Sequence, residues 1–187
     1  MGGVVGVVFG CLFAMTQLLF KDQERDDNMK QFAEVKKCFE TLMSEDGCNI
    51  GADQCTLFLL DKDEKHLFSV ASGGDDKIYI EFPAYKGIAG KALTTGTAIN
   101  IPNAYEVPYF NSDVDKTSGY KTTSVLAVPI FEKSKTGARV VAVAQFINKI
   151  DRKSGKIVPF DEQDVASAER ACRYIAMFKP IIDGLVN

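Results

Sequence analysis

A ten-residue stretch with a glycine at each end constrains the fold of this chain most. It reads GIAGKALTTG from Gly87 to Gly96 and predicts a short helix, because glycine at a helix end permits the left-handed backbone that terminates it. The first amides of that helix, expected at Ile88, Ala89 and Gly90, would lack carbonyl partners within it. Such amides attract anions, and the small neighbouring side chains favour one carrying a single negative charge. The alternative is a helix that only packs its apolar face on a sheet.

Composition limits the classes of function. The 187 residues suffice for one domain with its own core, and 46% hydrophobic with 25% charged residues is ordinary globular composition. The net charge of -3 gives no basic face, so we expect no nucleic-acid partner. Five cysteines without a CxxC pair and one histidine, His66, offer no zinc spacing; we expect no metal, no cofactor and a reducing, cytoplasmic location. A metal-dependent hydrolase needs several such ligands, so we expect no catalysis by this chain.

The first 27 residues differ in character from the rest. Met1–Phe20 contains no charged residue and is long enough for a membrane span, but its glycines weaken a helix and it lacks the charged start of a secretory signal. We favour a helix between the subunits of a homodimer over a membrane segment. The predicted domains are therefore an apolar segment with a charged connector at 1–27, and a folded domain at 28–187.

Periodicity within the folded domain predicts an α+β fold. Apolar residues recur at helical spacing between Met29 and Met43, and Asp161 is expected to cap a C-terminal helix. Between these helices, apolar or alternating runs predict six strands, at 55–60, 66–72, 77–82, 98–101, 124–131 and 140–150. Because several are joined as hairpins, we expect an antiparallel sheet with helices packed on it.

Two further features point to a ligand. Residues 103–123 are polar, aromatic and rich in turn residues without an apolar period, and a loop of that length in a compact domain is usually functional, so we interpret it as a lid. Gln145 lies within an apolar strand, where its amide needs a partner or a ligand. The alternative is that Gln145 lies on the exposed face of a half-buried strand.

Three motifs in this order resemble the GAF domains of cyclic-nucleotide phosphodiesterases and some adenylyl cyclases. The resemblance covers about residues 32–183. The motifs are the pair Asn148-Lys149 followed after a spacer by Phe160-Asp161-Glu162, the run Gly87–Tyr105, and the lid pattern VDKTSGYKT at 114–122.

The resemblance implies a detailed arrangement. The GAF fold has a central antiparallel six-stranded sheet, with terminal helices on one face and a short helix plus lid over a ligand pocket on the other. Lys149 and Asp161 would form a bracing ion pair remote from the ligand. The cyclic phosphate would sit on the amides of the short helix, and the lid and sheet would contribute the remaining contacts. The implied ligand-binding residues are Thr56, Ala71, Ser72, Ile88, Ala89, Asn111, Asp115, Ser118, Thr122 and Gln145.

The resemblance also implies a function. It indicates a non-catalytic regulatory domain that binds a cyclic nucleotide and allosterically controls an attached phosphodiesterase catalytic domain, within a homodimer joined through terminal helices. Ala71-Ser72 and Gln145 stand where guanine-binding members have acidic groups, which favours cAMP over cGMP. The alternatives are a cGMP-binding domain, a ligand-free dimerisation module, and a redox enzyme with clustered cysteines, which we rank low.

Overall fold

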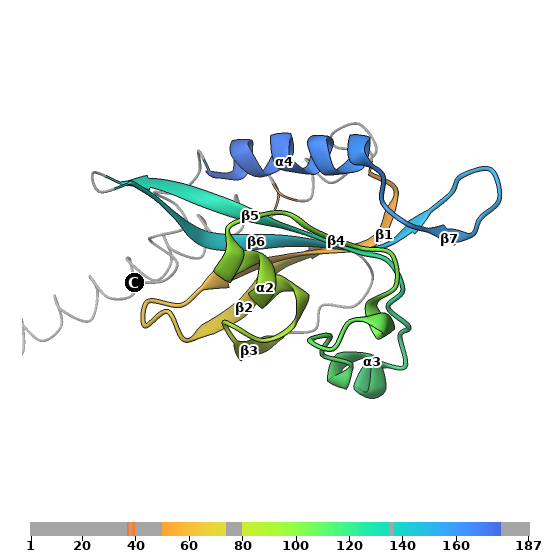
Figure 1. Ribbon diagram of the computed structural model, residues 1–187, viewed down its shortest axis with the longest axis horizontal. Coiled ribbons are helices and arrows are strands. Elements are labelled where there is room, and N and C mark those ends of the chain that lie inside the picture. The colour runs from red at the N-terminus through yellow and green to blue at the C-terminus, as the bar shows by residue number, and fades with distance from the viewer. Residues whose placement is uncertain (1–36, 38, 40–49, 74–79, 135–136, 177–187) are drawn as a thin grey trace, which may run out of the picture.

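The computed structural model describes residues 37, 39, 50–73, 80–134 and 137–176 (Figure 1). The predicted N-terminal segment at 1–27, most of the predicted N-terminal helix and the end of the C-terminal helix lie outside the described residues. Lys37 and Phe39 are helical, and the Phe39 side chain is buried in the core. Among the described residues, no helix has the length and apolar character needed to cross a membrane.

An antiparallel sheet forms the centre of the domain. Its main path runs in the order β3-β2-β1-β6-β5-β4, and β7 pairs with β6. The strands are β1 Ala52–Leu60, β2 His66–Gly73, β3 Glu81–Pro83, β4 Ile99–Ile101, β5 Val125–Ser134, β6 Gly137–Ile150 and β7 Ile157–Val158. The predicted antiparallel α+β fold is therefore confirmed. The two-residue β7 is an addition within the spacer that separates the Asn-Lys and Phe-Asp-Glu motifs.

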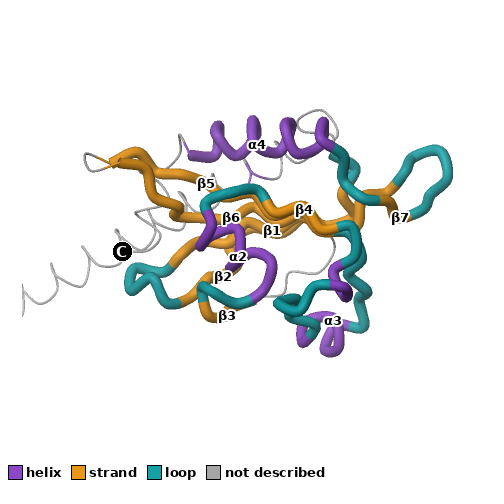
Figure 2. Tube along the Cα trace, viewed as in Figure 1, coloured by secondary structure: helices purple, strands orange, loops and turns teal. Residues whose placement is uncertain are grey.

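Helices cover the two faces of the sheet differently. The long α4, Glu162–Ala176, lies along one face, and α2, Gly87–Thr95, lies with α3, Asp113–Ser118, on the other (Figures 1 and 2). Alternate β1 side chains serve two separate cores: Leu57 and Leu59 join the α4 core, whereas Phe58 joins the α2 core. The strand β1 is thus buried on both faces.

The predicted short helix is confirmed, with one correction at its start. Gly96 ends α2 in the left-handed conformation at φ 62°, as expected. However, Lys86 is the N-cap residue, and the Gly90 amide donates to the Lys86 carbonyl at 3.2 Å. The prediction of an unpaired Gly90 amide was wrong, because the helix starts one residue earlier than expected. The amides without an intrahelical carbonyl are those of Gly87, Ile88 and Ala89.

The predicted lid is more ordered than its sequence indicates. It contains a short 3-10 helix, η1 at Ala104–Glu106, as well as α3. Asn103 starts η1 by accepting a hydrogen bond from the Tyr105 amide. Helices of one or two turns need no apolar period, which explains why the sequence predicts only an irregular loop here. Between the two ends of the lid, the Ala104 amide donates to the Thr123 carbonyl at 2.7 Å.

Candidate ligand-binding site

A cavity of about 310 Å³ lies between the sheet, α2 and the lid, on the face opposite α4. This volume is at the lower end of the range for small-molecule sites. Seven of the ten sequence-predicted ligand-binding residues line it: Thr56, Ile88, Ala89, Asn111, Asp115, Thr122 and Gln145. Most of the residues that the resemblance implied therefore lie around one cavity, whereas the ligand contacts themselves stay predictions.

Strand register aligns three of the predicted polar residues on neighbouring strands. Thr56 on β1 pairs with Ser72 on β2 and with Gln145 on β6, so the three occupy one row across the sheet. Ala71 pairs with Leu57, a residue of the α4 core, and Ser118 is the last residue of α3. The roles predicted for Ala71 and Ser118 at the ligand stay predictions.

Two side chains in this row have no hydrogen-bond partner among the described residues. The Thr56 side chain is only 7% exposed and lines the cavity, as does the half-buried Gln145. No fully buried side-chain nitrogen or oxygen among the described residues lacks a partner, so the polar groups of Thr56 and Gln145 are open to the cavity. A polar ligand or water in the cavity would therefore complete this row.

Sequence reasoning missed several residues of the cavity wall, among them Gln54, Lys86 and Tyr120. Gln54 lies two residues before Thr56 on the same strand, so the alternation of a strand could have identified it. Lys86 directly precedes the short helix and brings a positive charge to the start of that helix, where only small or apolar side chains were expected. Tyr120 reaches the cavity only through the course of the lid, which no local pattern predicts.

Asp115 joins separate parts of the lid by hydrogen bonds. Its buried carboxylate accepts hydrogen bonds from the Tyr105 hydroxyl at 2.9 Å, the Thr122 amide at 2.7 Å and the Thr122 hydroxyl at 2.7 Å. The hydrogen bond to Asp115 raises the pKa of Tyr105, since it favours the protonated hydroxyl. Asp115 and Thr122 were both predicted to contact the ligand; these bonds give them a role in fixing the shape of the lid.

Asn148 ties the end of the lid to β6. Its Oδ1 accepts from the Thr123 amide at 2.7 Å, and its Nδ2 donates to the Tyr120 hydroxyl at 3.0 Å and to the Lys121 carbonyl at 2.8 Å. Asn148 is 2% exposed and has φ 56°, a left-handed conformation that asparagine tolerates better than most residues. The motif asparagine is therefore a lid anchor.

Tyr120 extends this anchor to the neighbouring strand. Its hydroxyl donates to the Asp53 carboxylate on β1 while accepting the hydrogen bond from Asn148. Burial, followed by the hydrogen bond to Asp53, raises the pKa of Tyr120 well above its usual value of 10.0. The hydroxyl therefore stays protonated at neutral pH and can act as the donor in this bond.

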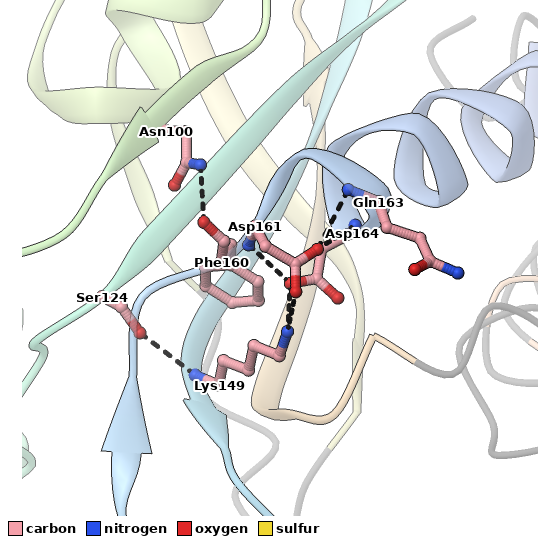
Figure 3. A network of polar contacts seen from close by, with 7 residues as sticks. All are labelled: Asn100, Ser124, Lys149, Phe160, Asp161, Gln163 and Asp164. Carbon is pink, nitrogen blue, oxygen red and sulfur yellow. Dashed lines mark hydrogen bonds and ion pairs between the residues drawn. The ribbon is translucent and has the colours of Figure 1, made fainter.

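Lys149 braces β6 against the start of α4 (Figure 3). Its Nζ lies 2.9 Å from Asp161 Oδ2 and also contacts the Asp164 carboxylate. Asp161 Oδ1 accepts from the Asp164 amide at 3.0 Å, and Asp164 Oδ2 accepts from the Asp161 amide at 2.7 Å. These reciprocal bonds form a capping box. The predicted Lys149–Asp161 pair and the Asp161 cap are confirmed, and Asp164 is a partner that the sequence reasoning missed.

The rest of the Phe-Asp-Glu motif supports the same junction. Phe160 is buried in the α4 core, and its carbonyl accepts from Asn100 Nδ2 at 2.9 Å (Figure 3). Glu162 is exposed in the first turn of α4, where its negative charge interacts favourably with the positive end of the helix dipole. The motif thus joins β4, β6 and α4 on the far side of the sheet from the cavity.

Replacing Lys149 with methionine is expected to lower the free energy of unfolding by about 1–3 kcal/mol, because it leaves the Asp164 carboxylate, 11% exposed, without its cation. Lys149 also lowers the pKa of Asp161 below its usual 3.8, so the share of the stabilisation that comes from the Lys149–Asp161 pair should be present above that pH and disappear as pH falls through the lowered pKa. Urea unfolding of the variant at pH 7 and below pH 4 measures the loss of stability and its pH dependence.

The control is Lys153→Met, at an exposed lysine, which should change stability little. An equal loss in both variants would contradict a bracing role for Lys149.

Comparison with known proteins identifies the class. The GAF domain family matches residues 34–177, so the chain belongs to the GAF domain family. Among curated proteins, it is 36% identical over 114 residues to the probable 3',5'-cyclic phosphodiesterase pde-5 of Caenorhabditis elegans. That match covers 54% of this chain and 15% of the worm protein. The chain therefore resembles the GAF region of a phosphodiesterase and spans a small part of that relative's length.

Solved structures share the fold at low sequence identity. The GAF domain of an Acinetobacter phosphoenolpyruvate-protein phosphotransferase has a TM-score of 0.59 at 16% identity, covering 88% of this chain and 97% of that one. A type II free methionine-R-sulfoxide reductase from Thermoplasma acidophilum has a TM-score of 0.62 at 15% identity, covering 86% and 98%. At these identities the likeness shows the fold alone. Cys55 and Cys172, the described cysteines, are both buried, and neither lines the cavity.

Proposed function

We propose that this GAF domain is a non-catalytic regulatory module that binds a cyclic nucleotide, with cAMP preferred over cGMP. The observation that carries the proposal is a single cavity that combines the amides at the start of α2 with the polar side chains of Thr56 and Gln145, which have no hydrogen-bond partner among the described residues. The amides suit a singly charged cyclic phosphate. Thr56 and Gln145 offer the hydrogen bonds that a ribose or a base edge requires, and the apolar wall, including Phe58 and Phe110, buries the rest.

The Gln145 side chain supports the choice of adenine. A glutamine amide carries one donor and one acceptor edge, which matches the amino group and ring nitrogen that adenine presents side by side. Guanine presents two adjacent donors at the corresponding edge, and a carboxylate satisfies them better than an amide. Gln145 lies between Thr56 and Ala127 in the register of the sheet, at the centre of the cavity floor.

The same contacts suggest how binding would be transmitted. Asn148 holds the lid and the next residue, Lys149, holds the start of α4, so ordering of the lid around a ligand acts on two adjacent residues of β6. A shift at this point would reach α4 and, through it, an attached domain. The controlled domain would be a phosphodiesterase catalytic domain, on the strength of the curated relative. The ligand must favour one of two arrangements for such control to exist.

Gln145→Glu is expected to move the preference from cAMP towards cGMP, because it exchanges the donor edge of the amide for a second acceptor. The added negative charge should weaken both nucleotides, so the ratio of the two dissociation constants is the quantity to read. We expect that ratio to move at least roughly tenfold towards cGMP. Isothermal titration calorimetry with both nucleotides, on the wild type and the variant, measures it.

The matched control is Gln163→Glu, which makes the same change on the exposed surface of α4 and should leave the ratio unaltered. Saturable binding of cAMP to the wild type supports the proposal. If neither nucleotide binds, it fails for this domain, and the ligand-free dimerisation module becomes the function to pursue. If Gln145→Glu leaves the ratio unchanged, the base does not lie against Gln145.

Thr122→Ala is expected to weaken cAMP binding roughly tenfold or more, because it removes the charge-assisted hydrogen bond that the Thr122 hydroxyl donates to Asp115 and so loosens the lid. The adjacent Thr123 provides a control, since its hydroxyl bonds to no other described residue and only its amide is held, by Asn148. Thr123→Ala should therefore bind cAMP as the wild type does. Equal affinity in Thr122→Ala and the wild type would rule out this lid as the closing element.

A further inference from the structure

Lys86 brings a positive charge to the end of the cavity at which α2 begins. It is the N-cap residue of α2, next to the unpaired amides of Gly87, Ile88 and Ala89, and its side chain is 46% exposed. Of the described residues that line the cavity, Lys86 is the only lysine or arginine. The other charged one is Asp115, whose oxygens already accept from Tyr105 and Thr122.

Lys86 forms a contact between the start of α2 and the lid. Its Nζ lies 3.5 Å from Asp113 Oδ2, on the first residue of α3 and 27 residues further along the chain. Lys116, in the same lid helix, lies 3.4 Å from the other oxygen of Asp113. The hydrogen bonds from Lys116 and from Lys86 keep the pKa of Asp113 below its usual value of 3.8, so Asp113 is charged at neutral pH.

The cavity beside Lys86 has an independent mark of a ligand site. The Thr56 side chain, more than nine-tenths buried, faces this cavity without a hydrogen-bond partner among the described residues. The site is therefore more than a helix start with a nearby lysine. An anion on the amides of α2 would lie close to the Lys86 ammonium group, which is held at present by a solvent-exposed ion pair of little energy.

We infer that Lys86 and Asp113 form a charge switch that couples an anionic ligand to the lid helix. The anion draws Lys86 away from Asp113, so Lys86 strengthens binding and Asp113 opposes it, both as a competitor for Lys86 and as a like charge. This inference rests on the proposed cyclic-nucleotide function. It adds two residues that determine how strongly the site prefers a charged ligand. The lid would then respond to the phosphate itself as well as to the base.

The switch makes opposite predictions for two neighbouring substitutions. Lys86→Gln should weaken cAMP binding by about 5- to 20-fold, and Asp113→Asn should tighten it by about 3- to 5-fold, as expected for single charges near a partly solvated phosphate. In the Lys86→Gln background, the gain from Asp113→Asn should shrink, because the competition has been removed. Tighter binding after loss of a lid contact is a result that a merely structural role for Asp113 would not give.

The experiment is calorimetry with two ligands at two salt concentrations. The ligands are cAMP and adenosine, which has the same base and sugar but no phosphate. Lys86→Gln should weaken cAMP far more than adenosine, and the wild type should lose more cAMP affinity with added salt than the variant does. Lys91→Gln, an exposed position on the same helix outside the cavity, should bind both ligands as the wild type does. Thermal unfolding checks that the variants are folded.

The outcomes separate this inference from the function on which it rests. If the wild type binds cAMP but Lys86→Gln binds it equally well, the switch is overturned and the proposed function stands. If the variant weakens cAMP and adenosine alike, Lys86 does not act on the phosphate, and the switch is again overturned. If Asp113→Asn weakens binding, Asp113 holds the lid and does not compete for Lys86. If the wild type binds no cyclic nucleotide, both proposals fall.

Discussion

Asn148→Ala is expected to lower the free energy of unfolding by about 4 kcal/mol. The substitution removes three hydrogen bonds, to the Thr123 amide, the Tyr120 hydroxyl and the Lys121 carbonyl, from a residue that is almost fully buried. Each contributes about 1 kcal/mol net, and a buried partner left unpaired costs more. Alanine also tolerates φ 56° less well than asparagine, which adds about 1 kcal/mol. Urea unfolding followed by circular dichroism measures the loss.

Asn148→Gly separates the two causes. Glycine loses the same side-chain hydrogen bonds but accepts the left-handed backbone, so it should be less destabilising than alanine by up to about 1 kcal/mol. Asn100→Ala is a control that removes one side-chain hydrogen bond, to the Phe160 carbonyl, and should cost about 1 kcal/mol. If Asn148→Ala cost no more than Asn100→Ala, the lid anchor would be refuted. Faster hydrogen exchange at the amides of 121–123 in the alanine variant would locate the loss in the lid.

Gly90→Ala is expected to have the second large effect on stability. Local helix propensity and tertiary packing predict opposite signs for that effect. Alanine is preferred to glycine inside a helix by about 1 kcal/mol, so local propensity predicts a stabilised protein. In the folded domain, however, a Cβ on Gly90 would lie 2.5 Å from the Tyr85 carbonyl carbon and 2.7 Å from the Ala84 carbonyl oxygen. These are backbone atoms, so the segment before α2 must move. We expect a net loss of about 1–3 kcal/mol.

Thermal unfolding of Gly90→Ala measures this sign directly, and cAMP titration measures its effect on the site. Because the displaced segment leads into the amides of α2, affinity should fall together with stability. Lys91→Ala is the matched control: it adds alanine at the next, exposed position of the same helix and should change stability by less than about 0.5 kcal/mol. An unfolding temperature for Gly90→Ala at or above that of the wild type would contradict the close approach at Gly90.

Much of the fold could be predicted because its signals are local. The apolar runs identified β1, β2, β5 and β6 to within a few residues, and Gly96 and Asp161 correctly marked the end of α2 and the start of α4. A strand pattern or a helix cap depends on residues within one or two turns of each other, so it is visible in the sequence. The start of α2 was misplaced by one residue because Lys86 is not a typical capping residue.

The candidate site was predicted less completely. Resemblance to GAF domains supplied Thr56, Gln145 and the α2 amides. Strand alternation with Thr56 could have added Gln54, but Lys86 and Tyr120 had no signal that distinguished them from surface residues. Asp115 and Thr122 were expected to contact the ligand, whereas the structure joins them by hydrogen bonds within the lid.

By itself, the sequence determined where most of the strands and the two longer described helices lie and where several of them begin and end, and the resemblance to GAF domains added the ion pair of Lys149 with Asp161. Only the tertiary structure decided that Thr56 and Gln145, 89 positions apart, share one row of the sheet, that Asn148 holds the lid, and that Gly90 has no room for a side chain. The physical reason is the range of the interactions. Propensity, alternation and capping act between near neighbours, whereas register, close packing and long-range hydrogen bonds exist only once distant segments have been brought together.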